Sequence, residues 1–126
     1  MPHHVSKAEF ARLVEQALAE LPPPFDQYLE EISIEICDRP TPEQLRSARV
    51  GRGSLLLGLY QGRPLTRRHV EDEMVLPDRI YIFQQAIEEV CQSEQELIGQ
   101  ARTTVLHEIG HHFGMNEKDL ADLGYG

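Results

Sequence analysis

The chain has 126 residues, of which 40% are hydrophobic and 26% are charged, and its formal net charge is −9. This length and composition are typical of a globular domain that buries a core without disulfides, so we expect residues 1–126 to form one domain. The negative charge disfavours nucleic acids and anionic membrane surfaces as partners, and no run of about 18 apolar residues is present that would span a membrane.

The N-terminal part of the sequence predicts one long helix, one strand and one short helix. An apolar stripe at helical spacing predicts a helix over Ser6–Leu21, in which Ser6 and Glu9 form a capping box and three consecutive prolines end the helix. Isoleucines alternate with other residues over 32–37, which is typical of a half-buried strand. A mostly polar stretch follows, with a short helix expected over Pro42–Ala48.

The middle of the sequence predicts two more strands. Leu55–Tyr60 is apolar enough for a strand that is covered on both faces, except at Gly58. A long connection, Gln61–Asp78, separates it from a third strand over Arg79–Phe83, and a short helix over Gln84–Cys91 follows. Helices and strands are therefore intermixed, which favours an α+β fold with a three- or four-stranded sheet packed against two or three helices.

Two cysteines, Cys37 and Cys91, lie far apart in apolar segments. Their spacing belongs to no metal-binding pattern, and free thiols in a reducing compartment are favoured over a disulfide. The first residues also lack the basic and apolar regions of a signal peptide. Together these observations predict a cytoplasmic protein.

The most informative pattern is an H-E-x-x-H motif at residues 107–111. It falls on a predicted amphipathic helix over Ser93–Phe113. Residues four apart lie on the same face of a helix, so His107 and His111 can present two imidazole nitrogens to one Zn²⁺. Glu108 lies beside that face, where its carboxylate can act as the general base of a metallopeptidase.

A zinc site of this kind needs a third protein ligand, and the position ten residues after the first histidine is Glu117. In H-E-x-x-H-x-x-G-x-x-H proteins this position carries the third histidine, and a glutamate oxygen is an acceptable zinc ligand. Gly114, expected to end the helix as a left-handed cap, permits the turn that brings Glu117 back under the metal, so we favour Glu117. Two alternatives stay open: Glu117 stabilises the start of a new helix, or Asp119 or Asp122 is the ligand.

These motifs resemble those of the small bacterial zincin-like metallopeptidases. The resemblance rests on residues 107–114 (HEIGHHFG), 76–82 (LPDRIYI) and 58–62 (GLYQG). It implies a zincin-like fold, in which a small sheet packs against the active-site helix together with the helix expected near the N-terminus. It also implies a zinc site made by two histidines and an acidic third ligand. True metzincins carry a methionine-containing turn downstream of the zinc helix, whereas the only methionine after the motif here is Met115.

The leading hypothesis is a zinc-dependent peptidase. The three expected ligands would hold Zn²⁺, and Glu108 would take a proton from the attacking water. Peptides or proteins are the expected substrates. An extended peptide could pair with an exposed strand edge, which either Leu55–Tyr60 or Arg79–Phe83 would provide.

Two rival hypotheses belong to other functional classes. The first is a non-proteolytic zinc-binding domain with a structural or partner-binding role, which the small size and the missing methionine turn favour. Glu108 argues against it, because a purely structural site has no use for a general base. The second is a metal-dependent ribonuclease, which the net charge of −9 disfavours.

Overall fold

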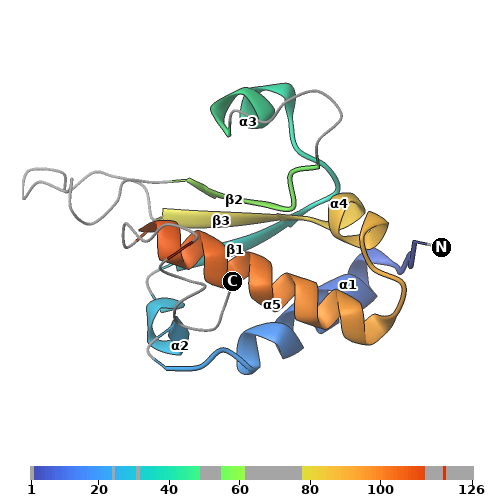
Figure 1. The fold of residues 1–126 in the computed structure, drawn as a ribbon, viewed down its shortest axis with the longest axis horizontal. Coiled ribbons are helices and arrows are strands. Elements are labelled where there is room, and N and C mark those ends of the chain that lie inside the picture. The colour runs from blue at the N-terminus through green and yellow to red at the C-terminus, as the bar shows by residue number, and fades with distance from the viewer. Residues whose placement is uncertain are drawn as a thin grey trace, which may run out of the picture.

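The structure of the protein, a computed structural model, describes residues 2–23, 25–30, 32–48, 55–61, 78–112 and 118. For His111 and His112 it describes the backbone alone. Within these ranges it contains five helices and three strands (Figure 1). Gly114, Glu117 and the two aspartates considered as alternative ligands lie outside the described residues.

Two helices begin at side-chain caps that the local sequence supplies. α1 spans Lys7–Ala19, and its N-cap Ser6 accepts a hydrogen bond of 3.1 Å from the amide of Glu9. α3 spans Pro42–Ser47 and begins at Thr41, whose hydroxyl takes part in a complete capping box. Each cap satisfies amides that the start of a helix leaves without an intrahelical partner. Both helices confirm the sequence prediction to within a few residues at their ends.

Three further helices lie in the described residues. α2 is a short helix, Phe25–Tyr28, that the sequence pattern does not predict. α4 spans Gln84–Glu89, and α5 spans Glu94–His112. Ser93, where the sequence predicts this helix to begin, caps α5 by accepting a 3.2 Å hydrogen bond from the Glu96 amide. The H-E-x-x-H residues therefore occupy the C-terminal end of α5.

The strands β1 (Ile32–Cys37), β2 (Gly58–Gln61) and β3 (Asp78–Phe83) form one sheet. Their order is β1-β3-β2, with β3 parallel to β1 and antiparallel to β2. In the described part of the chain, β3 is thus the central strand and β2 lies at an edge.

The second strand begins at Gly58 and not at Leu55, so the predicted strand was too long at its start. The expected coverage on both faces is also wrong at Leu55, a residue that is 53% exposed. The strand starts later because its partner is short. β3 ends at Phe83 and α4 begins at the next residue, so residues 55 and 56 have no β3 residue to pair with.

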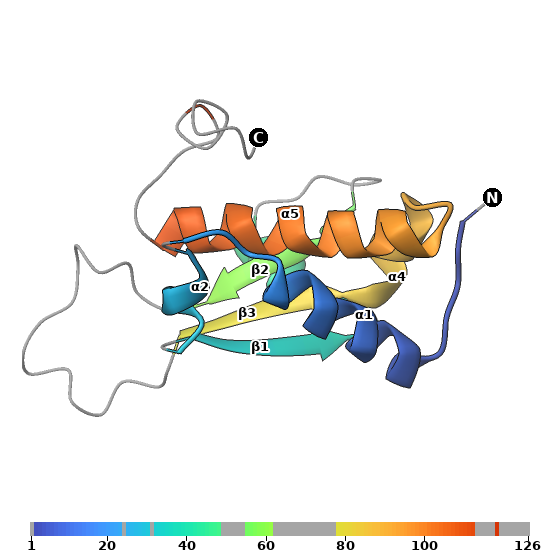
Figure 2. The same ribbon diagram turned by 90° about the horizontal axis from the view of Figure 1, so that it is seen from below.

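α5 and α1 cover one face of the sheet, and α3 lies on the opposite side (Figures 1 and 2). α5 packs on both β2 and β3 and on α1. The core between these layers consists of buried apolar side chains, among them Phe10, Leu13, Val14, Ala17, Ile32, Ile80, Ile82, Leu97, Ala101, Val105, Leu106 and Ile109. This arrangement confirms the predicted α+β fold, in which a small sheet packs against the motif-bearing helix and an N-terminal helix.

Two predictions from cysteine content and hydropathy can be compared with the structure. Cys37 and Cys91 are both free, as expected, although only Cys91 is fully buried. Burial raises the pKa of both thiols, which disfavours their thiolate form. Among the helices described, none is long and apolar enough to cross a membrane.

Candidate zinc and peptide site

The motif residues are oriented by the apolar face of α5. Ile109 and Val105 are each 0% exposed and lie in the core, which fixes the rotation of the helix. His107 and Glu108 consequently lie at the margin of the core, where both are half-buried. Figure 2 shows α5 lying across this face of the sheet beside β2.

One ring nitrogen of His107 is buried and unsatisfied within the described part of the chain. Its Nε2 is buried and has no hydrogen-bond partner in the described part of the chain. Leaving a buried polar atom unsatisfied costs roughly 1–3 kcal/mol, so such an atom calls for an explanation such as an ion. Imidazole nitrogen is a common zinc ligand, and α5 continues through the backbone of His111. The chemistry at His107 therefore fits the metal that the sequence predicts.

The complete ligand set is not placed by the described residues. The side chain of His111 and the whole of Glu117 lie outside them. Among the residues that are described, no three His, Cys, Asp or Glu side chains come together as a metal site. That finding bears on neither of these two residues, so the three-ligand set stays a prediction.

Glu108 reaches from α5 to the edge strand. Its Oε1 accepts a hydrogen bond of 2.6 Å from the backbone amide of Tyr60 on β2. The register of the sheet explains why this amide is available. The carbonyl of Leu57 accepts a 3.0 Å hydrogen bond from the Phe83 amide, so residue 57 turns its backbone groups toward β3. Because these groups alternate along an antiparallel strand, Gly58 and Tyr60 turn theirs away from β3.

Gly58 allows α5 and β2 to approach closely. It pairs with the core residue Ile82, so both positions face α5. A Cβ on Gly58 would lie 2.4 Å from Cγ2 of Thr104 and 3.8 Å from Cγ of Glu108. Thr104 itself is only 6% exposed, so this polar residue of the amphipathic helix is buried beside β2. Sequence reasoning missed this contact, although a lone glycine in an apolar strand is the signal that could have revealed it.

The sequence profile of the zincin-like metallopeptidase family matches residues 29–126. The chain belongs to this family. The matched span contains the whole H-E-x-x-H motif, Gly58 and the predicted ligand Glu117. The resemblance inferred from the motifs is thereby confirmed.

Comparison with curated proteins gave no match for this zincin-like chain. Among solved structures, it is similar to a conserved hypothetical protein from T. thermophilus, with 25% sequence identity and a TM-score of 0.55. The similarity covers 94% of this chain and 99% of the other. The two proteins therefore share their fold over nearly their whole length.

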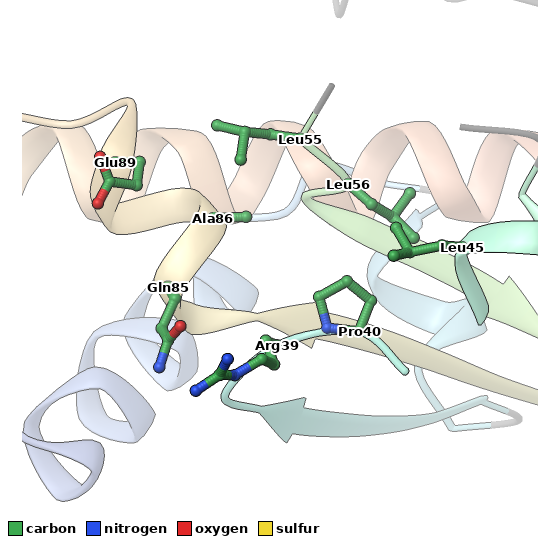
Figure 3. Close-up of a pocket in the computed structure, with 8 residues that line it drawn as sticks. All are labelled: Arg39, Pro40, Leu45, Leu55, Leu56, Gln85, Ala86 and Glu89. Carbon is green, nitrogen blue, oxygen red and sulfur yellow. The ribbon is translucent and has the colours of Figure 1, made fainter. Parts of the chain in front are cut away.

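A cavity of about 300 Å³ lies elsewhere on this zincin-like protein (Figure 3). Its walls come from the segment after β1, from α3, from the residues before β2 and from α4. The lining residues are Arg39, Pro40, Leu45, Leu55, Leu56, Gln85, Ala86 and Glu89. None of them belongs to the H-E-x-x-H motif or to β2, so neither His107 nor Glu108 lines this cavity.

Proposed function

We propose that the protein is a zinc-dependent peptidase in which Glu108 is the general base. The position of Glu108 supports this most directly. It follows His107, whose Nε2 lacks a partner among the described residues, and it is hydrogen-bonded to the edge strand at Tyr60. The base of a peptidase must reach a water that is next to both the metal and the substrate backbone. Glu108 follows the proposed ligand His107 in the chain and contacts the edge strand at Tyr60, which fits both requirements.

The proposed zinc ligands are His107, His111 and Glu117, with Asp119 or Asp122 as alternatives to Glu117. When bound, Zn²⁺ supplies a Lewis acid that polarises the scissile carbonyl and makes water a stronger acid. Glu108 accepts a proton from the attacking water and passes it to the leaving amine nitrogen. This role requires the Glu108 carboxylate to stay outside the ligand set.

β2 is the proposed docking edge for an extended peptide. The sequence left two strands possible, but β3 is paired on both sides and so has no edge to offer. Gly58 turns its backbone N–H and C=O away from β3, where an added strand would form main-chain hydrogen bonds. A peptide bound there would run past Tyr60, whose amide contacts the Glu108 carboxylate.

Cleavage of a peptide library tests the proposed function. The purified protein would be loaded with one equivalent of Zn²⁺ and incubated with unstructured peptides, and the products would be identified by mass spectrometry. We expect cleavage by the wild type, loss on chelation, recovery when zinc is restored, and none with Glu108→Gln. Glu15→Gln is the matched control, because it makes the same change at an exposed position on α1.

Two results would contradict the peptidase proposal. One is full cleavage by Glu108→Gln, which would point to a contaminating peptidase or to another base. The other is stoichiometric zinc binding without cleavage of any peptide. That second result would favour the alternative of a non-proteolytic zinc-binding domain.

A further inference from the structure

We propose that Gly58 and Thr104 form a positioning pair, which sets the spacing between β2 and α5 and thereby holds Glu108 on the Tyr60 amide. The catalytic meaning of this pair rests on the proposed function, since it assumes that Glu108 is the base. The contacts themselves do not depend on that assumption, and they can be tested without any substrate.

Gly58 leaves no room for a side chain. An added Cβ would lie 2.4 Å from Thr104 Cγ2, a distance that real Cβ atoms essentially never show, and 3.1 Å from the carbonyl oxygen of Tyr81. The backbone of Gly58 does not adopt the left-handed conformation that favours glycine. Glycine is therefore needed here for space, which is the usual meaning of an isolated glycine where two elements approach closely.

The Thr104 side chain is fixed in the position where its methyl group would clash with a side chain at position 58. Its Oγ1 accepts a hydrogen bond of 3.3 Å from Nε2 of Gln100, one turn earlier on α5. Rotation that moved the Cγ2 methyl aside would also move Oγ1 and break this bond. The neighbouring residue Val105 is 0% exposed, and Ala101 one turn back is 1% exposed, so the helix backbone is fixed by the core. A side chain at position 58 would therefore push β2 and α5 apart.

The distance between Gly58 and Thr104 also sets the distance between Tyr60 and Glu108, because each pair joins β2 to α5. Glu108 lies one turn after Thr104 on the same face of α5, and Tyr60 lies two residues after Gly58 on the same face of β2. The Tyr60–Glu108 hydrogen bond is 2.6 Å long. Because N–H···O bonds extend to about 3.2 Å, a separation of about 1 Å would break it. A displacement of about 1 Å at a catalytic group can cost about 10²-fold in rate.

NMR of the Tyr60 amide tests the pair in the zinc-free and the zinc-loaded protein. In the wild type we expect this amide proton to be shifted downfield and protected from exchange, and Glu108→Ala should abolish both properties. Gly58→Ala should abolish them as well. The double variant Gly58→Ala/Thr104→Ser should recover them, because serine keeps the hydroxyl that Gln100 binds and lacks the Cγ2 methyl.

Gly99→Ala provides the matched control for the glycine substitution. Gly99 lies on α5, and a Cβ added there would meet nothing within 4 Å. This variant should keep the downfield, protected Tyr60 amide. A change of the Tyr60 signal in Gly99→Ala as large as that in Gly58→Ala would overturn the steric argument, because the effect would not depend on the Gly58–Thr104 contact.

Turnover of a peptide identified in the library experiment adds a second readout. Gly58→Ala should lower kcat by about 10²-fold and leave zinc affinity unchanged, because the helix that carries the histidines stays in the core. In a protein that already carries Thr104→Ser, Gly58→Ala should lower kcat by no more than about threefold. The effects of substituting these two contacting residues are coupled and therefore not additive. Equal losses in the two backgrounds would show that Thr104 is not the obstacle.

The outcomes separate this inference from the proposed function. If the wild type cleaves no peptide, the proposed function fails, while the NMR variants still decide whether the pair positions Glu108. If Gly58→Ala alone does not fold but the double variant folds with the Tyr60 signature, the pair is supported. An unchanged Tyr60 amide in Gly58→Ala, or no recovery with Thr104→Ser, overturns the inference.

Discussion

The backbone amide of Val5 donates a 2.9 Å hydrogen bond to the carboxylate of Glu88, 83 positions further along the chain. Glu88 is 4% exposed, and it also accepts a 3.1 Å bond from Gln84 Nε2 and lies 3.1 Å from His4 Nδ1. Burial by itself raises the pKa of Glu88. The hydrogen bonds from Val5, Gln84 and His4 outweigh it, and the pKa of Glu88 lies below its ordinary value. The buried carboxylate of Glu88 therefore links the N-terminal segment to α4 through hydrogen bonds.

We expect Glu88 to make stability depend on pH in the acid range. Because its folded pKa is lowered, the stabilisation is fully present above the unfolded pKa, near 4.5, and is lost as the pH falls through the folded pKa. Glu88→Gln should flatten this dependence and lower stability at neutral pH by about 1–3 kcal/mol, because the buried hydrogen bonds are no longer matched. Thermal unfolding from pH 7 down to about pH 3 measures both effects.

The control for this prediction is Glu89→Gln, the exposed neighbour on α4. It should keep the acid dependence of the wild type. If Glu88→Gln loses stability below pH 4.5 as steeply as the wild type does, Glu88 is not the group responsible.

We expect each chain to bind one Zn²⁺. Elemental analysis gives the stoichiometry, and titration against a competing chelator gives the affinity. His107→Ala removes the buried ring nitrogen that lacks a partner among the described residues, and it should weaken zinc binding by at least about 100-fold. His3→Ala, which removes an imidazole near the N-terminus, should leave zinc affinity unchanged. A stoichiometry well below one after attempted refilling would exclude the site.

Glu108→Gln should retain zinc and lose hydrolysis. The glutamine oxygen can still accept the hydrogen bond from the Tyr60 amide, so the local structure is expected to stay intact. Loss of a general base typically costs about 10²–10⁴-fold in rate. Single-turnover rates and zinc titration on the same samples check both halves of this prediction. Release of zinc from the variant would instead show that Glu108 is a ligand.

Glu117→Ala should weaken zinc binding more than Asp119→Ala or Asp122→Ala does. The reason is spacing: Gly114 precedes Glu117 by three residues, so one tight turn returns its carboxylate to the histidines. If Glu117 only stabilises the start of a helix, its removal should cost about 0.3–1 kcal/mol of stability and leave zinc affinity within a few-fold. Zinc dissociation constants for the three variants decide between these roles.

Much of the fold could be predicted from the sequence because it depends on neighbouring residues. Helix starts follow from caps within one turn, as at Ser6, Thr41 and Ser93. The alternating isoleucines of β1 and the apolar stripe of α5 reflect the periods of a strand and a helix. α2 escaped prediction because its four residues are too few to show a period.

The sequence by itself determined most of the helices and strands, the family resemblance and the chemistry expected of H-E-x-x-H, since these depend on spacing along one segment. Only the tertiary structure decided that, among the described strands, β3 is central and β2 is an outer strand. It also decided that Glu108 meets the Tyr60 amide across 48 positions and that Gly58 lies against Thr104. Strand order and register arise from pairing between distant segments and from packing on a shared core, which local periodicity does not encode.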